Sequence, residues 1–254
     1  MVHLGLTART GLDAGRRACA PCANAGGLIM TFSLVARCVE TGRFGIVISS
    51  SSPAVAARCA HVRAGVGAVA SQNVTDPALG PMLLDRLAPG LPVAEALSAL
   101  TLNRPHIDYR QILAIDADGR TAVHSGAQVL GVWGVAQGLD CVAGGNLLAN
   151  EGVPTAMIAA FERAIGPFGD RLLAALDAGL RAGGEAGPVH SAGLKIAHRL
   201  SWPEVDLRID WSDAPIDDLR RLWVLYAPQA AAYVQRAEDP SAAPSYGVPG
   251  DDTR

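Results

Sequence analysis

The order in which apolar segments of different period follow one another limits the fold of this chain most strongly. Short β-rich runs come first, followed by two helical segments, a hairpin, two more helical segments and further strands. The expected strands cover residues 31–37, 45–49, 66–70, 111–116, 121–124, 141–144, 191–197 and 205–210, and the expected helices cover 77–87, 93–102, 154–164, 170–182 and 215–226. A parallel doubly wound sheet needs strict alternation of strand and helix, which this order lacks. We therefore predict an α+β fold of stacked, mostly antiparallel sheets with helices on their outer faces.

Turn and capping residues support these assignments. The polar, glycine-containing segment 40–44 separates the first two strands as a hairpin loop would, and Asp118-Gly119 is typical of a tight hairpin turn. Asp76 stands where an N-cap belongs, ahead of Pro77 at the first helical position. Gly183-Gly184 follows the fourth helical segment, where a C-cap belongs.

Composition excludes several classes of protein. The 254 residues are 50% hydrophobic and 18% charged with a net charge of −3, as in a globular chain rather than a disordered or fibrous one. The sequence has no basic block, so nucleic acid is not an expected partner, and it has no apolar run that predicts a membrane span. Five scattered cysteines predict reduced thiols and a cytoplasmic location. The low charged fraction leaves apolar surface to cover, which predicts a homo-oligomer, either a dimer or larger.

The first 29 residues differ from the rest. They show little periodicity and no run suited to a secretory signal. Because Met30 directly precedes the first strand, the leading interpretation is a start codon assigned 29 residues too early, with an organelle presequence or a propeptide as alternatives. The CxxC at 19–22 lacks the flanking strand and helix of a redox motif. We expect a disordered or mis-assigned extension at 1–29, one domain at 30–236 and a Pro/Gly/Ser-rich tail at 237–254.

Familiar cofactor and metal motifs do not fit their context. Gly65-Val-Gly67 begins a GxGxxA pattern but stands at the start of a strand, whereas a dinucleotide loop follows a strand and opens a helix. The sequence has no P-loop, HExxH or GxSxG motif, and its six histidines are spread singly, without the spacing of a metal site. We therefore expect no cofactor and no metal.

One candidate nucleophile depends on where the mature chain begins. If Met30 initiates translation and is removed, Thr31 becomes N-terminal and carries a hydroxyl and a free α-amine on one residue. The amine can then act as general base for that hydroxyl, and an α-amine pKa of about 7.7–8.0 leaves a useful neutral fraction near pH 7. Threonine after methionine is common, so this arrangement alone does not establish a catalytic function.

Several segments of the chain resemble a known family. They are MTFSLVAR at 30–37, AGVGAVASQ at 64–72, LGP at 79–81, QILAID at 111–116, GNLLA at 145–149, GG at 183–184, SAGL at 191–194 and PEVDLR at 203–208. Over residues 30 to about 236 the sequence is similar to the family catalogued as domain of unknown function 1028. The resemblance implies the N-terminal nucleophile (Ntn) hydrolase superfamily, a four-layer αββα sandwich, and family members that begin at the equivalent of Met30. Cys38 replaces a common aspartate, and Pro188-Val-His190 replaces a stretch that is usually basic or contains glutamine.

The resemblance and the candidate nucleophile together predict an amidohydrolase or acyl-transfer enzyme that acts on a small amide, with Thr31 Oγ as nucleophile. Gly145 and Asn146 are the expected oxyanion donors, because this strand end offers unhindered backbone N–H groups and a side-chain amide. The residues expected to bind substrate are Ser33, Ser50, Ser51, Gln72, Asn73 and His190. Ser33 shares a strand face with Thr31 and would orient its amine. Ordinary turn, loop or capping roles stay open for these residues.

Two alternatives come from other classes. The same fold without the chemistry would make this a non-catalytic small-molecule-binding or assembly protein. An autoprocessing enzyme would cut directly before its nucleophile, but residues 1–29 have no pattern of a folded precursor. A free N-terminus at Thr31 separates the enzyme from the binding protein, because any preceding residue would cap the amine and remove the base.

Overall fold

Two antiparallel sheets lie face to face in the computed structural model, which describes residues 31–248. Sheet A has the strand order β10-β9-β2-β1-β8-β7, and sheet B has the order β3-β4-β5-β6. The strands of sheet A are β1 (Thr31–Arg37), β2 (Phe44–Ser50), β7 (Gly134–Gly138), β8 (Cys141–Asn146), β9 (Ser191–Ala197) and β10 (Val205–Ile209). Those of sheet B are β3 (Ala60–Arg63), β4 (Gly67–Asn73), β5 (Arg110–Asp116) and β6 (Thr121–Ser125).

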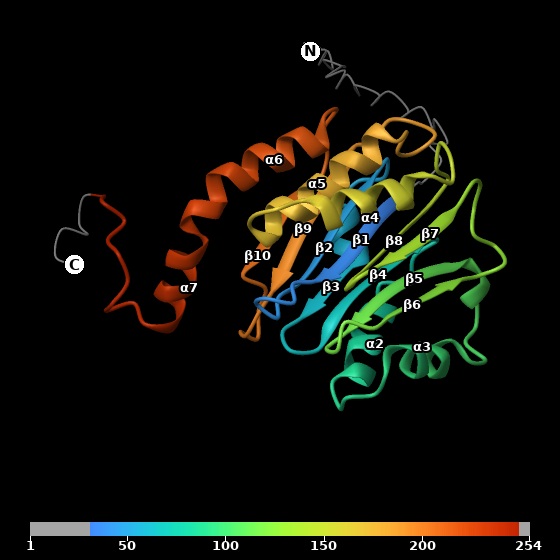
Figure 1. Cartoon of the computed structure of the whole chain (residues 1–254), viewed down its shortest axis with the longest axis horizontal. Helices are drawn as coiled ribbons and strands as arrows, with labels where there is room; N and C mark the ends of the chain where they lie inside the picture. The colour runs from blue at the N-terminus through green and yellow to red at the C-terminus, as the bar shows by residue number, and fades with distance from the viewer. Residues whose placement is uncertain (1–30, 249–254) are drawn as a thin grey trace, which may run out of the picture.

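Helices cover the outer face of each sheet, which completes the four layers seen in Figure 1. The helices are α1 (Val55–Cys59), α2 (Leu79–Leu87), α3 (Val93–Thr101), α4 (Val153–Arg163), α5 (Phe168–Arg181), α6 (Pro215–Tyr226) and α7 (Ala230–Glu238), with short 3-10 turns η1 (Ile107–Tyr109) and η2 (Ala227–Gln229). Helices α4 and α5 cover sheet A, and α2 and α3 cover sheet B. The predicted α+β fold, an αββα sandwich of two antiparallel sheets, is confirmed.

Each pair of neighbouring layers encloses its own apolar core. Phe32 and Leu34 of β1 pack under α4 and α5, whereas Val35 of the same strand packs in the core between the two sheets. Strand β1 is therefore buried on both faces, with apolar side chains toward the helices and Val35 beside polar residues toward sheet B. Because alternate residues of a strand share a face, Thr31 and Ser33 lie on the same side as Val35 and face sheet B.

All the predicted strands and helices occur, with ends that shift by a few residues. Helix α2 begins at Leu79 and not at Pro77, so the predicted N-cap role of Asp76 is wrong: the N-cap residue is Ala78, and no side chain caps the helix. Asp76 instead forms a turn ahead of the helix, in which Ala78 N donates to its Oδ1 at 3.1 Å. The sequence patterns miss α1, β3 and β7, which are short, and α7, which has no buried residue. The expected start of the tail at residue 237 falls within α7.

The double glycine after α5 turns the chain back across the end of sheet A. Gly183 and Gly184 have φ angles of +122° and +57°, and Gly184 N donates to Gly179 O at 2.9 Å, as in a Schellman C-cap. This confirms the predicted C-cap. The loop that follows reaches the residue after β8, where Ala186 N donates to Leu147 O at 3.0 Å, and then enters β9.

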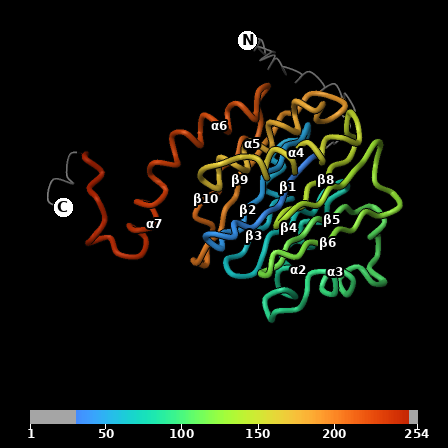
Figure 2. The backbone as a smooth tube through the Cα atoms, viewed as in Figure 1, coloured from blue at the N-terminus to red at the C-terminus, as the bar shows by residue number. Residues whose placement is uncertain are grey.

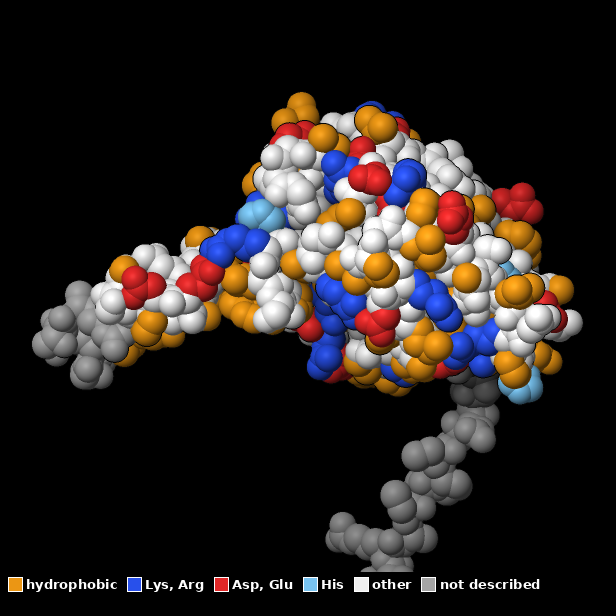
Figure 3. Space-filling view, turned by 90° about the horizontal axis from the view of Figure 1, so that it is seen from below, with side chains coloured by type: hydrophobic (Ala, Val, Ile, Leu, Met, Phe, Trp, Pro, Cys, Tyr) orange, Lys and Arg blue, Asp and Glu red, His pale blue; other side chains and the backbone are white. Residues whose placement is uncertain are grey.

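The C-terminal helices leave the body of the sandwich. Ile216, Leu219 and Trp223 of α6 pack on sheet A, but α7 extends away from it, as the tube in Figure 2 shows. Figure 3 shows this segment as an arm that projects from the body. Within residues 31–248, no helix has the length and apolarity that crossing a bilayer requires. The CxxC at 19–22, Met30 and the last six residues lie outside the described residues.

Candidate functional site

A row of polar side chains crosses one end of sheet A on the face that meets sheet B. Thr31 at the start of β1 lies opposite Ser50 of β2 on one side and Asn146 of β8 on the other. Ser50 in turn lies opposite Ser191 of β9. All four residues are buried. The register of four strands therefore brings three of the predicted site residues, Thr31, Ser50 and Asn146, next to one another.

A second polar row on sheet B faces the first. Gln72 of β4 lies opposite Gln111 of β5, which lies opposite Ser125 of β6. Ser33 Oγ donates to Gln72 Oε1 at 2.6 Å, and Gln72 Nε2 donates to Gln111 Oε1 at 2.8 Å. Hydrogen bonds thus close this end of the core between the sheets, where apolar side chains fill the rest.

The side-chain amide of Asn146 is buried, and one of its polar atoms makes no hydrogen bond among the described residues. Its Nδ2 donates to Gln111 Oε1 at 3.4 Å, but among the described residues its Oδ1 has no hydrogen-bond partner. Asn146 is 0% exposed, so the lone acceptor costs about 1–3 kcal/mol of stability. A half-turn of the amide would present Nδ2 in its place. The residue can therefore offer either an acceptor or a donor to a group that lies beside Thr31.

The Thr31 hydroxyl begins a short chain of hydroxyl groups. Thr31 Oγ1 donates to Ser50 Oγ at 3.4 Å, and Ser50 Oγ and Ser52 Oγ are 2.8 Å apart. Arg58 of α1 donates to Ser52 Oγ at 2.9 Å. A cation at the end of this chain favours negative charge on the hydroxyl oxygens and disfavours a proton on a nearby amine.

Glu185 is a buried carboxylate beside this row that sequence patterns do not identify. Ser51 N donates to both of its carboxylate oxygens, at 3.2 and 3.0 Å. Burial raises the pKa of Glu185 to about 8, although the hydrogen bonds from Ser51 oppose that rise. A single glutamate in a glycine-rich loop has no local signal of function, so only the three-dimensional arrangement reveals its place.

Other predicted residues have structural contacts of their own. Asn73 has a φ of 69°, and its Nδ2 donates to Tyr109 O at 2.7 Å while its Oδ1 accepts from Leu130 N. Gly145 lies inside β8, paired with Phe32 and Gly134, and its carbonyl accepts from Gln111 Nε2.

The remaining two, Ser51 and His190, lie at the edge of the row. Ser51 contributes its backbone N–H to Glu185. His190 N donates to Ser50 O at 2.8 Å, which places its backbone next to the row. Its imidazole stacks on Trp211 with ring centroids 4.4 Å apart, and its Nδ1 is 3.1 Å from Ser212 O. The side chain of His190 is therefore engaged by the loop after β10.

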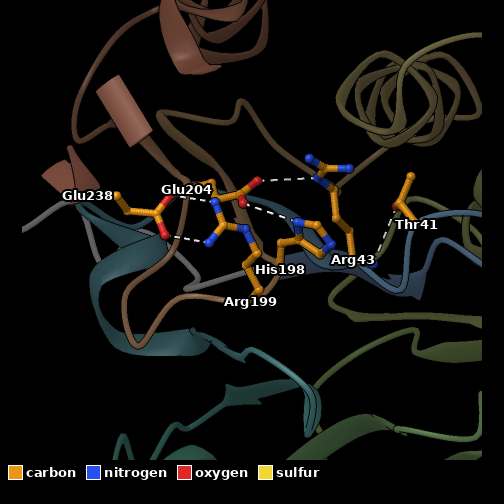
Figure 4. A network of polar contacts seen from close by, with 6 residues as sticks. All are labelled: Thr41, Arg43, His198, Arg199, Glu204 and Glu238. Carbon is orange, nitrogen blue, oxygen red and sulfur yellow. Dashed lines mark hydrogen bonds and ion pairs between the residues drawn. The ribbon is translucent and has the colours of Figure 1, made fainter. Parts of the chain in front are cut away.

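A large cleft of about 1130 Å³ lies elsewhere, between the arm and the far end of sheet A, and none of the predicted site residues lines it. Figure 4 shows its ionic network: Glu204 accepts from Arg43 and His198, each at 3.3 Å, and Arg199 pairs with Glu238 of α7. The pair of Arg199 with Glu238 ties the arm to the body. Within residues 31–248, no cluster of histidine, cysteine or carboxylate side chains could hold a metal ion.

Comparisons with known proteins show which family the chain belongs to. The profile of a family of unknown function, DUF1028, matches residues 31–219. The crystal structure of SPO2555 from Silicibacter pomeroyi, described as DUF1028, is 30% identical, with 82% of this chain and 91% of that chain covered and a TM-score of 0.76. Anbu (ancestral beta-subunit) from Yersinia bercovieri is 13% identical over 80% of this chain and 97% of that one, with a TM-score of 0.34. Among curated proteins, none matches. The chain belongs to the DUF1028 family.

Proposed function

We propose that the protein hydrolyses, or transfers the acyl group of, a small-molecule amide, with Thr31 as an N-terminal nucleophile. The observation that carries the proposal is the place of Thr31, whose hydroxyl starts a polar row between the two sheets and is flanked by Ser50 and Asn146. The sandwich is the arrangement that the resemblance to Ntn hydrolases implies. Nothing in this chemistry requires a cofactor.

In the proposed reaction, the α-amine of Thr31 takes the proton of its own hydroxyl as Oγ attacks the substrate carbonyl. The tetrahedral intermediate collapses when the C–N bond breaks, and the protonated amine gives its proton to the leaving nitrogen. An ester on Thr31 Oγ remains. Attack by water, with its proton taken by the same amine, releases the acid and restores the enzyme; attack by another amine would complete an acyl transfer.

Asn146 is the side chain best placed to meet the reacting carbonyl, because it lies directly opposite Thr31 on the same face of the sheet. Presented through Nδ2, its amide would donate to the oxyanion, an interaction whose removal typically costs about 2.7–4 kcal/mol. Presented through Oδ1, it would accept an N–H of the substrate amide. Gly145, on the same strand, would contribute a backbone N–H as a second donor to the oxyanion.

The proposal requires that Thr31 be the first residue of the chain, after translation from Met30 and removal of that methionine. In the full chain Thr31 is 3% exposed and its nitrogen is part of a peptide bond, so it has neither access nor a base. The test is to place a specific protease site before Thr31, cleave the folded protein and screen a library of small amides before and after cleavage. Activity that needs cleavage supports the enzyme; binding without turnover supports the alternative of a non-catalytic protein.

We also propose that the protein is a homo-oligomer in which a second copy packs against the arm. Helix α7 has nine residues and buries none of them, and a helix this short is not stable in water without packing. Tyr233 of α7 is exposed, and so are Val224 and Leu225 at the end of α6, directly before the arm. Sedimentation velocity of the full chain tests this proposal: a monomer at all concentrations would refute it.

A further inference from the structure

The carboxylate of Glu185 binds the backbone N–H of Ser51, which directly follows β2, where the hydrogen-bonding ladder between β1 and β2 stops. Cys38 N donates to Arg43 O at 2.8 Å, which makes these two residues a hydrogen-bonded pair of the ladder. Hydrogen-bonded pairs recur every second residue, so Phe32 and Ser49 form another, in agreement with the register. The next hydrogen-bonded pair lies two residues further along each strand. In that pair, Ser51 lies opposite the position directly before Thr31.

The direction of the Ser50 carbonyl supports this assignment. Ser50 O accepts from His190 N, so the peptide groups of Ser50 face β9. Those of Ser51 face the opposite way, toward the line of β1, because successive residues of a strand alternate. Both oxygens of Glu185 bind this N–H. The carboxylate therefore lies on the β1 side of Ser51, at the ladder position directly before Thr31.

Glu185 has no opposite charge to compensate for its burial. It is 4% exposed, and within residues 31–248 no charged side chain is among the groups that set its pKa. The titratable groups brought to this end of the sheet are Arg58, which binds Ser52, and His190, which lies 3.7 Å from Asp213. A buried acid without a partner is costly, and such an acid beside a chain position that can carry a positive charge points to that charge as its partner.

We propose that Glu185 holds the α-amine of Thr31 when Thr31 is the first residue of the chain, and so orients that amine toward its own hydroxyl. This inference rests on the proposed function, since it assumes that the chain is cut before Thr31. Glu185 is then a positioning residue. It fixes the base by an ion pair and leaves the hydroxyl free to point along the row to Ser50.

The proposed ion pair would change the pKa of the Thr31 amine, which can be measured. A neighbouring carboxylate favours the protonated form of an amine, so it raises the pKa of the Thr31 amine relative to a variant with a neutral residue at position 185. The experiment uses the full chain with a specific protease site before Thr31, cleaved after folding. The pKa of the α-amine is obtained from the pH dependence of its acetylation by acetic anhydride, quantified by mass spectrometry of the N-terminal peptide.

Glu185→Gln keeps the shape of the side chain and removes its charge, and Glu185→Ala is a second neutral variant. We expect each to lower the pKa of the amine by about one unit, which raises the neutral fraction about tenfold at low pH. Glu185→Asp retains the charge and should stay closer to the wild type. Glu204→Gln is the matched control, because Glu204 is also a buried carboxylate but binds Arg43 at the other end of β2.

The two proposals can fail separately. If both neutral variants titrate like the wild type, Glu185 does not hold the amine, whatever the activity of the protein. If the pKa falls as expected but no amide is hydrolysed, the inference about Glu185 stands and the proposed amidase does not. A shift of equal size in Glu204→Gln would show a general electrostatic effect and would also overturn the inference.

Discussion

Ser33 Oγ donates to Gln72 Oε1 at 2.6 Å, and this buried hydrogen bond joins β1 of one sheet to β4 of the other. Through it, the strand that begins with Thr31 is held against the polar row of sheet B. Because both side chains are fully buried, neither can exchange its partner for water. The geometry at Thr31 therefore depends on contacts between the sheets as well as within them.

The first prediction concerns this bond. Ser33→Ala leaves Gln72 Oε1 buried without its donor, so the free energy of unfolding should fall by about 1–3 kcal/mol, measured by urea denaturation. Ser98→Ala is the control, since Ser98 is an exposed residue of α3, and it should change stability by less than about 0.5 kcal/mol. Equal stability of the two variants would mean that the bond between the sheets contributes little.

The second prediction tests the nucleophile in the chain cut before Thr31. Thr31→Ala removes only the hydroxyl and should abolish turnover of any amide substrate found, while Thr31→Ser keeps hydroxyl and amine and should retain measurable activity. One residue inserted before Thr31 keeps the side chain but displaces the base, so this variant should behave like Thr31→Ala. Turnover at the wild-type rate in Thr31→Ala or in the insertion variant would place the catalytic group elsewhere, with His190 and His124 the next residues to test.

The third prediction follows from the raised pKa of Glu185 in the uncut chain. Burial raises this pKa from 4.5 to about 8, so between those values the folded state binds more protons than the unfolded state. Below about pH 4.5 the carboxyl is protonated in both states, and the folded state is then most stable with respect to this group. As the pH rises toward 8, the unfolded state loses its proton while the folded state keeps it, which favours unfolding. The free energy of unfolding should therefore fall over this range by as much as about 1.4 kcal/mol per pH unit.

Denaturation of the wild type and of Glu185→Gln at several pH values isolates this contribution, because other groups titrate equally in both proteins. The difference in unfolding free energy between the two should change steadily from pH 5 to pH 8. A constant difference would show that Glu185 is ionised throughout this range and that burial does not control it.

Local patterns predict the strands of this fold but only part of its site. The run at 31–37 places apolar residues at every second position, Phe32, Leu34 and Ala36, and is therefore easily recognised as a strand. Asp118-Gly119 forms the turn expected of it, with a φ of +83° at Gly119. The sequence patterns do not identify β7, because it is a glycine-bounded edge strand whose side chains are at best half-buried. They do not identify α7 either, because it has no buried face whose period could be detected.

The site itself depends on register between distant segments. The contact of Thr31 with Ser50 follows from the hairpin, but the placement of Asn146 and Gln111 beside them requires the strand order of two sheets. Strand order is not enough to predict the position of Glu185, because that position depends on how the glycine turn after α5 folds back over β8. No periodic pattern encodes that return, which is why Glu185 is not among the predicted site residues.

The fourth prediction concerns two buried thiols. Burial raises the pKa of Cys59 to about 11 and that of Cys141 to about 12, and only the thiolate reacts with alkylating agents. Both thiols should therefore resist iodoacetamide at pH 8 in the folded protein and react fully in urea, as peptide mass spectrometry would show. Leu139→Cys provides the matched control, because Leu139 is 79% exposed and lies two residues from Cys141. The introduced thiol should be alkylated rapidly in the folded protein, and alkylation of Cys141 at a similar rate would mean that the end of β8 opens readily to solvent.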